Sequence, residues 1–219
     1  IPDYTGMRVK ELVEEKFHLP CEVENDVNCA GLAEAHFGAA RDAGISLCLT
    51  IGTGIGGAIV IDKKVFRGCS GSACEVGYMH MMGSTFQEIG ASRILTRRVA
   101  KRKAEREPEL AKKINGKWIF EHAWAGDPDC VEAIDGMADA LGMGIANICY
   151  VLNPEVVVLG GGIMAQKEYL YDRIRRAMDR YLIPAVSEHT RLAFAENQNQ
   201  AGMLGAWCHF MSRHGGLSV

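Results

Sequence analysis

The sequence predicts an α/β fold in which helices flank a mixed β-sheet. Two observations support this prediction. Short runs rich in β-branched residues, at 47–51, at 58–61 and again after residue 155, have the length and composition of strands. Segments of helical length, such as 130–152, separate these runs. The chain shows no internal repeat and no low-complexity linker.

Composition and charge narrow the functional classes. The chain has 219 residues, of which 48% are hydrophobic, and this is enough for one large domain or two small ones. The formal net charge of −3 offers no general attraction to nucleic acid or to an anionic membrane. No apolar run approaches the roughly 20 residues of a membrane span. Eight cysteines lack CxxC or metal-finger spacing, so we expect reduced thiols in a cytoplasmic protein.

The expected elements follow one another with short connections, bounded by changes of periodicity or by glycine and proline. The first part of the chain is expected to form a helix at 9–17, a short strand at 21–25, a helix rich in small residues at 26–40, strands at 47–51 and 58–61, and a turn at 62–64 before 65–66. One or two basic helices, broken at Pro108, follow between 84 and about 114, and a long helix spans 130–152. The last part is expected to form a buried strand running into a glycine turn at 155–164, a helix at 167–182, a strand at 191–196 and a last helix at about 200–212. Gly142 and Gly144 in the long helix indicate places where a neighbouring backbone approaches closely.

The stretch LTIGTGIGGAIVID, residues 49–62, places four glycines between two β-branched runs. Gly52, Gly54 and Gly57 satisfy GxGxxG, but a dinucleotide-binding turn must lead into a helix, and here a strand follows. The sequence therefore predicts a β-hairpin whose turn binds phosphate through backbone N–H groups, with Thr53 as a hydroxyl donor. A tight hairpin whose glycines only supply positive φ is an equally good interpretation of this loop alone.

A second glycine cluster follows the apolar run at 156–159. Gly160, Gly161 and Gly162 stand at the carboxyl end of a buried strand, where open α/β sheets bind ligands. Three glycines let the flat face of a base or ribose lie against the main chain. A strand-to-helix turn with unusual backbone angles explains one or two of these glycines, but not easily three.

Several ordered motifs resemble the ROK family of bacterial sugar kinases and sugar-responsive repressors. They are ENDVNCAGLAE, LTIGTGIGGAIV, FRGCSGSACEVGYMH, ANICYVLNPEVVVLGGGIM and QAGMLGAW, and the resemblance runs from residue 1 to about 207. It implies the actin/hexokinase-like (ribonuclease H-like) ATPase fold and the use of ATP, with Mg²⁺ accompanying the nucleotide. The implied nucleotide-binding residues are Gly52, Thr53, Gly54, Gly56 and Gly57 around the terminal phosphates and Gly160, Gly161 and Gly162 beside the adenosine.

The resemblance also assigns the chemistry of the motif ENDVN. A sugar hydroxyl that attacks the γ-phosphorus loses its proton late in a loose transition state, so a carboxylate is a sufficient base. The family pattern makes Asp26 that base and gives Asn25 to the sugar hydroxyls. Without the resemblance, Asn25 and Asp26 are better interpreted as a helix cap. The pattern also places Glu75 and Glu88 as acceptors of hydrogen bonds from the sugar ring.

The chain departs from the family pattern after Glu75. Tyr78 stands where the family has a histidine, and the cysteine-rich zinc loop that precedes the second glutamate is missing. Because a structural zinc needs four ligands, and His80, Cys69 and Cys74 do not form a credible set, we predict no metal site and no structural zinc. The tyrosine offers an aromatic face near the anomeric side of the sugar. It suggests a sugar with a substituent there, such as a β-glucoside, phosphorylated on a primary hydroxyl.

The family resemblance further predicts the domain organisation. Residues 1–219 correspond to the large C-terminal lobe, and 198–213 to a terminal helix that packs on an N-terminal small lobe, for which the chain has no counterpart. We therefore expect the chain alone to transfer phosphate poorly or not at all. The predicted full-length function is an ATP-dependent sugar kinase that forms a homodimer. The alternative is the sugar-sensing lobe of a repressor, with nucleic acid as a partner only through an N-terminal helix-turn-helix.

Overall fold

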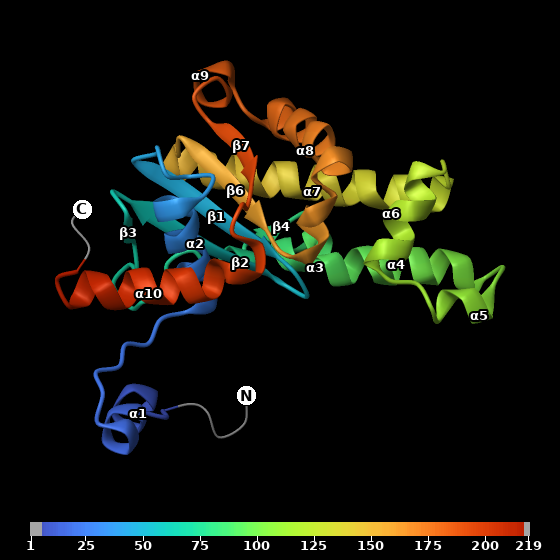
Figure 1. The fold of residues 1–219 in the computed structure, drawn as a ribbon. Helices are drawn as coiled ribbons and strands as arrows, with labels where there is room; N and C mark the ends of the chain where they lie inside the picture. Colours follow the sequence, from blue (N-terminus) through green and yellow to red (C-terminus); the bar gives the residue numbers. More distant parts are fainter. Residues whose placement is uncertain (1–5, 217–219) are drawn as a thin grey trace.

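A computed structural model describes residues 6–216 of the chain. Within that range, one five-stranded sheet has the order β3-β2-β1-β6-β7 (Figure 1). Its strands are β1 (Ile45–Ile51), β2 (Ile55–Ile61), β3 (Lys64–Val65), β6 (Val156–Gly160) and β7 (Arg191–Phe194). β1 pairs antiparallel with β2 and parallel with β6, and β6 pairs parallel with β7. The sheet is therefore mixed, as the sequence predicts.

Helices cover both faces of the sheet (Figure 1). The larger elements are α1 (Val9–Phe17), α2 (Asp26–Phe37), α3 (Phe86–Gly90), α4 (Ser92–Ala104), α6 (Gly116–Trp124), α7 (Pro128–Leu152), α8 (Lys167–Tyr181) and α10 (Ala201–Arg213). The shorter elements are α5 (Pro108–Ala111), α9 (Pro184–Ser187), the 3₁₀ turns Val76–Tyr78, Gly162–Gln166 and Gln198–Gln200, and the small hairpin of β4 (His80–Met81) and β5 (Ser84–Thr85). Helix α2, with α10 packed on it, covers one face, and α7 with its neighbours covers the other.

The two faces of β1 explain why this strand is central. Leu47, Leu49 and Ile51 belong to the large core that they share with α7 and α8. Cys48 belongs to the smaller core under α2. Because side chains alternate along a strand, a strand covered on both faces is apolar almost throughout. Gly31 lets α2 lie close to this second face, since a Cβ there would come within 2.9 Å of the Ala58 Cβ.

The glycines of α7 allow close contacts: at Gly142 the α8 backbone approaches, as the sequence predicts, whereas at Gly144 the neighbour is a side-chain ring. A Cβ on Gly142 would lie 2.4 Å from the Ala177 Cβ in α8, and one on Gly144 would lie 2.4 Å from the Phe86 ring in α3. Both distances are below van der Waals contact. The helix begins with Asp127 as N-cap, whose carboxylate accepts a hydrogen bond from the Cys130 N–H at 3.1 Å, and with proline at its first position.

Three local predictions differ from the structure. Residues 21–25 form no strand in the described chain; they are an extended link between α1 and α2 with no adjacent strand to pair with. Helix α6 was not predicted, because its apolar face is short and Gly116 opens it. The β4–β5 hairpin was also missed, although Met82 and Gly83, both at positive φ, form the two-residue turn typical of such hairpins.

The segment before α2 stands apart from the sheet. Within the described residues α1 contributes no buried side chain, and Figure 1 shows it away from the layers. Leu12 and Phe17 in this helix are 52% and 58% exposed. Its link to the body is Glu22, which pairs with Lys10 at 2.9 Å and with His214 at 3.4 Å. No helix among residues 6–216 is long and apolar enough to cross a membrane.

Candidate active site

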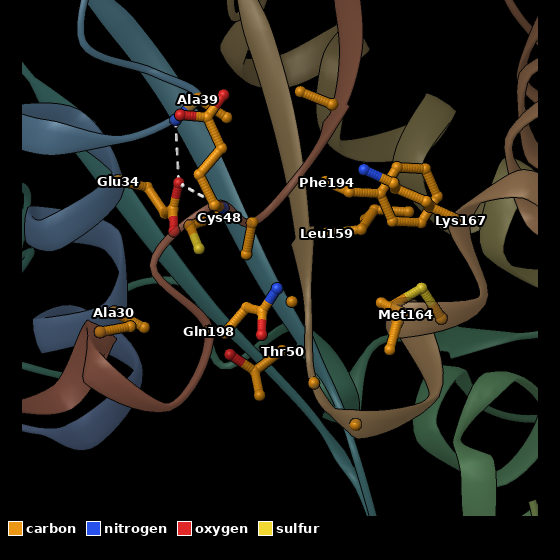
Figure 2. Close-up of a pocket in the computed structure, with 18 of the residues that line it drawn as sticks. Ala30, Glu34, Ala39, Cys48, Thr50, Leu159, Met164, Lys167, Phe194 and Gln198 are labelled. Carbon is orange, nitrogen blue, oxygen red and sulfur yellow. Dashed lines mark hydrogen bonds between the residues drawn. The ribbon is translucent and has the colours of Figure 1, made fainter.

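A cavity of about 910 Å³ opens where β1 and β6 end. It lies between α2, the carboxyl ends of β6 and β7, and the start of α10. Its walls include Asp26, Thr50, Gly160, Gly161, Gly162 and Phe194. Figure 2 shows Glu34 and Ala39 on one side of the cavity and Met164, Lys167 and Phe194 on the other. The size is that of a small-molecule site, and the position is the edge at which open α/β sheets bind ligands.

Asp26 lines this cavity from the first turn of α2. One of its oxygens accepts a hydrogen bond from the Val27 N–H at 2.9 Å. The other oxygen has no hydrogen-bond partner in the described residues. A carboxylate with an open oxygen in such a place is able to take a proton from a neighbouring hydroxyl.

Asn25 is the N-cap of α2. Its side-chain oxygen accepts hydrogen bonds from the Val27 N–H at 2.8 Å and the Asn28 N–H at 3.1 Å. The capping interpretation is therefore confirmed for Asn25. A contact from its exposed amide nitrogen to a sugar remains a prediction.

The glycine triplet lines the cavity, but its members differ in what they require. Gly161 has φ +104°, and a Cβ on it would lie 2.2 Å from the Ile51 carbonyl oxygen, so the fold itself demands glycine there. A Cβ on Gly162 would meet no described atom within 4 Å. The backbone-geometry explanation thus covers Gly161 alone. The open space at Gly162 leaves main chain available to a flat ligand.

The hairpin glycines are not explained by positive φ. All four lie in the described chain, and none of them has a positive φ. Gly56 and Gly57 belong to β2, where a Cβ would lie 2.7 Å from the Val27 Cγ2 and 2.5 Å from the Cys74 Sγ. Their role in the fold is therefore to admit these neighbours. Gly52 faces open space, because a Cβ on it would meet no described atom within 4 Å, so the turn keeps one exposed stretch of bare main chain.

Two residues that sequence reasoning missed hold the hairpin turn. The Ser92 N–H and hydroxyl both donate to the Gly52 carbonyl, at 3.0 and 2.6 Å. The Gln87 side chain packs beside Gly54, where a Cβ would lie 2.8 Å from its Oε1. Ser92 is the first residue of α4, and a serine at a helix start was the available signal. Because the turn is pinned on one side, its free N–H groups keep a fixed direction.

Glu75, Tyr78 and Glu88 do not line the cavity. All three are exposed, Tyr78 by 64%. They lie on the segment that packs against the hairpin, since a Cβ on Gly77 would come 2.3 Å from the Ile55 carbonyl oxygen. Glu88 is engaged in the capping box of α3, where its Oε2 accepts from the Ser84 and Thr85 hydroxyls at 3.0 and 3.1 Å. These bonds lower the pKa of Glu88 and leave its second oxygen without a hydrogen-bond partner in the described chain.

A partly buried cluster of charged side chains, Glu24, Arg67 and His209, packs at the start of α2. Glu24 pairs with Arg67, and the Arg67 guanidinium lies 3.3 Å from the His209 Nδ1 in α10. Burial alone would raise the pKa of Glu24, but hydrogen bonds from Asn28, from the Asn25 N–H and from Arg67 lower it. Burial lowers the pKa of His209. The cluster fixes the two residues that precede Asp26 to both the 66–73 loop and α10.

Metal-binding side chains do not gather in the described residues. No group of three or more His, Cys, Asp or Glu in that part of the chain could hold a metal ion. All eight cysteines fall in the described range and carry free thiols. Burial raises the pKa of Cys74 to about 12, so this thiol is neither a ready ligand nor a nucleophile. The absence of a structural zinc remains a prediction.

Comparisons with known proteins identify the family of the chain. The model of the ROK family matches residues 2–212. An uncharacterized protein of Clostridium perfringens is 49% identical over 96% of this chain and 70% of its own length. The β-glucoside kinase of Listeria innocua is 32% identical over 95% of this chain and 70% of its own length.

Solved structures with similar folds include an enzyme and a regulator. The ROK family glucokinase of Streptomyces griseus, in complex with glucose and AMPPNP, has a TM-score of 0.80 and 32% identity over 90% of this chain and 70% of its own. A ROK family transcriptional regulator, described as a homolog of the E. coli MLC protein, has a TM-score of 0.85 and 27% identity over 95% of this chain and 56% of its own. The fold is thus the actin/hexokinase-like one, and the chain belongs to the ROK family.

Proposed function

We propose that this chain is the nucleotide- and sugar-binding lobe of an ATP-dependent kinase that phosphorylates a primary hydroxyl of a sugar or glycoside. The observation that carries the proposal is that Asp26 and the glycines 160–162 line one cavity. The kinases among its relatives support the same reaction. Bare main chain at Gly162, which lines the cavity, suits a nucleotide. In the hairpin turn the Gly52 N–H donates to the Gly54 carbonyl, so we assign the phosphates to the N–H groups of Thr53 and Gly54.

The chemistry follows from this placement. The acceptor hydroxyl lies at the free oxygen of Asp26 and attacks the γ-phosphorus, while the bond from that phosphorus to the bridging oxygen of ADP breaks. The hydroxyl proton passes to Asp26. The N–H groups of Thr53 and Gly54 in the hairpin turn orient the phosphates. Mg²⁺ supplies charge neutralisation on the phosphates when it is bound. Among the cavity-lining residues, the Asp26 carboxylate would be available to hold the ion.

We place the acceptor on the segment that packs against the hairpin. Glu75 and Glu88 there each expose a carboxylate, and Tyr78 presents an exposed ring. An aromatic face suits the apolar side of a second sugar ring. The proposed substrate class is therefore a sugar with a substituent at its anomeric carbon, such as a β-glucoside.

We also propose that residues 6–216 belong to the large lobe of a two-lobed, homodimeric protein. Three observations support a second lobe near α1 and α10. In the described chain α1 buries no side chain, Met203 and Trp207 on α10 are 72% and 47% exposed, and the chain spans 70% of the length of the kinase relative. Closure of two lobes would exclude water from the site. The 219-residue chain alone should then show little or no phosphate transfer.

The alternative function is the sugar-sensing lobe of a repressor, which the likeness to a ROK transcriptional regulator favours. A sensor needs sugar affinity but no base. The site retains a free carboxylate oxygen at Asp26, and this favours the kinase.

The substitution Asp26→Asn tests the proposal in the longest polypeptide that contains residues 1–219. We expect kcat for ATP-dependent sugar phosphorylation to fall roughly 10²- to 10⁴-fold, the usual contribution of a general base. The affinities for ATP and sugar should change less than about twofold, because the binding groups remain. Asp42→Asn, at an exposed position outside the cavity, is the control. An unchanged kcat in Asp26→Asn, or sugar binding without turnover in the unsubstituted protein, would refute the kinase assignment.

A further inference from the structure

Glu34 is a buried carboxylate in the wall of the cavity. It lies in the last turns of α2 and is only 1% exposed. Its Oε2 accepts hydrogen bonds from the Ala39 N–H at 2.9 Å and the Glu196 N–H at 3.2 Å (Figure 2). Its Oε1 accepts from the Asn197 N–H at 2.9 Å and from the Asn197 side-chain amide at 3.1 Å. Both oxygens are therefore fully engaged with donors.

The position of this carboxylate is unfavourable for stability alone. No Lys, Arg or His in the described chain forms an ion pair with Glu34, so only hydrogen-bond donors offset the cost of burying it. It also lies towards the carboxyl end of α2, where the helix dipole disfavours negative charge. An apolar residue here would avoid burying a charge, but it would leave the N–H groups of Ala39, Glu196 and Asn197 without their acceptor. The four donors explain what the carboxylate gains instead.

Three of the four hydrogen bonds reach across to a single short segment. Residues 195–198 follow β7, and Ala195, Glu196 and Gln198 line the cavity beside Gly160. The hydrogen bonds from this segment to Glu34 come from Glu196 and Asn197. Other contacts of the segment are the hydrogen bond from the Ala195 N–H to the Leu159 carbonyl at 2.9 Å, the hydrogen bond from the Asn197 side-chain amide to the Ala33 carbonyl at 3.2 Å, and an exposed ion pair of Glu196 with Arg41 at 3.4 Å. Without the carboxylate, the backbone N–H groups of Glu196 and Asn197 would lose their acceptor.

The turn after α2 is shaped to admit this contact. A Cβ on Gly38 would lie 2.0 Å from the Glu34 Oε2 and 2.5 Å from the Asn197 Nδ2. Glycine at position 38 thus leaves room for the carboxylate and its amide partner. Helix α2 consequently carries Asp26 in its first turn and, towards its last turn, Glu34, which anchors residues 195–198.

We infer that Glu34 is a positioning residue that holds 195–198 in place and thereby sets the affinity for the nucleotide. The inference rests on the proposed function, because it assigns the cavity to ATP. It predicts an effect on nucleotide binding that is separate from the chemical step, since Glu34 makes no contact with the reacting atoms. Asp26 stays at the other end of the helix, supported by Asn25 and Glu24.

The test is Glu34→Gln, studied in the longest polypeptide that contains residues 1–219. A glutamine keeps the volume but replaces one acceptor by a donor that faces N–H groups. We expect the dissociation constant for a fluorescent ADP analogue and the KM for ATP to rise roughly tenfold, as loss of a charged hydrogen bond predicts. The KM for sugar should change less than about twofold, and kcat at saturating ATP should stay within about threefold.

Two further variants separate positioning from general stability. Gly38→Ala displaces the carboxylate without changing its chemistry and should give the same selective loss of nucleotide affinity. Glu155→Gln is the matched control: Glu155 also accepts two backbone N–H groups, from Gly44 and Ile45 at 3.0 Å, but does not line the cavity. It should leave the nucleotide affinity unchanged.

The outcomes are distinct. Nucleotide affinity of Glu34→Gln equal to that of the unsubstituted protein overturns the inference while the kinase assignment stands. The inference is also overturned if Glu155→Gln loses as much nucleotide affinity as Glu34→Gln. It is likewise overturned if Glu34→Gln loses kcat and sugar affinity in parallel with nucleotide affinity, because Glu34 would then act only on the stability of the fold. Absence of nucleotide binding in the unsubstituted protein refutes the proposed function. If Glu34→Gln does not fold, Gly38→Ala decides between the first two outcomes.

Discussion

Replacement of Gly161 by alanine should destabilise the fold, whereas the same replacement at Gly162 should not. Gly161 has φ +104° and ψ 157°, a region of backbone space that is almost restricted to glycine. A new Cβ would also lie 2.2 Å from the Ile51 carbonyl oxygen. At Gly162 the added Cβ would meet no described atom within 4 Å, and its φ is ordinary.

The expected magnitude comes from two contributions. Backbone strain of this kind costs about 1–3 kcal/mol, and an added methyl in a packed place costs about 1–3 kcal/mol more. Their sum, roughly 2–6 kcal/mol, is a large part of the roughly 5–15 kcal/mol that stabilises an ordinary domain. Gly162→Ala should change the free energy of unfolding by less than about 0.5 kcal/mol. Its methyl group projects into the cavity, so nucleotide affinity should fall instead.

Urea denaturation followed by circular dichroism measures the first effect, and titration with a fluorescent ADP analogue measures the second. The pair gives opposite patterns: Gly161→Ala loses stability, and Gly162→Ala loses binding. Equal stability losses in the two variants would contradict the backbone geometry described above. Unchanged nucleotide affinity in Gly162→Ala would contradict the assignment of the triplet to the nucleotide.

Three further predictions concern helix packing, pH and substrate choice. Gly205→Ala should lower the melting temperature, because its Cβ would lie 1.7 Å from the Cys29 carbonyl oxygen and force α10 away from α2. Stability should fall with acid: His209, with its pKa lowered from 6.5, destabilises the fold as it protonates, and Glu24, lowered from 4.5, loses its bonds at still lower pH. Tyr78→His should shift the ratio of kcat/KM values from a β-glucoside towards free glucose, measured with a coupled ADP assay.

Each of these has a control and a contrary result. Gly202→Ala, where an added Cβ would meet no described atom within 4 Å, should leave the melting temperature unchanged. His209→Gln should reduce the part of the acid response that begins near pH 6.5 and leave the contribution of His36, whose pKa burial also lowers. An acid response equal to that of the unsubstituted protein would contradict the role of His209. A preference of the unsubstituted protein for free glucose over cellobiose would end the glycoside hypothesis.

Long periodic segments were predictable from the sequence, and pairing partners were not. The helix Val9–Phe17 begins and ends where its pattern indicates, and the buried run after residue 155 becomes β6. Residues 21–25 have the composition of a strand, but a strand also needs a neighbour, and a single sequence does not show one. The helix Gly116–Trp124 was missed because its glycine start and short apolar face give a weak helical signal.

For the candidate site, the sequence motifs were informative for residues that lie at the ends of long, regular elements. Asp26 and the triplet at 160–162 share a cavity, as their motifs suggest. The four hairpin glycines were harder, because two of them make room for Val27 and Cys74, contacts that are distant in sequence. Glu34 has the composition of an ordinary helix glutamate, and only the approach of 195–198 gives it a role.

The register of β1 has a consequence for how such a lobe can change its substrate. Thr50 pairs with Gly160, so the turn at 52–54 and the triplet at 160–162 leave the sheet from adjacent rungs of one parallel ladder. A change of register between β1 and β6 would therefore displace both loops relative to each other. Residues 66–88 carry no strand of the large sheet, but Arg67 holds Glu24 and Cys74 packs on β2. New acceptor preferences are therefore best engineered by changing exposed side chains of that segment, such as Tyr78, while these contacts are kept.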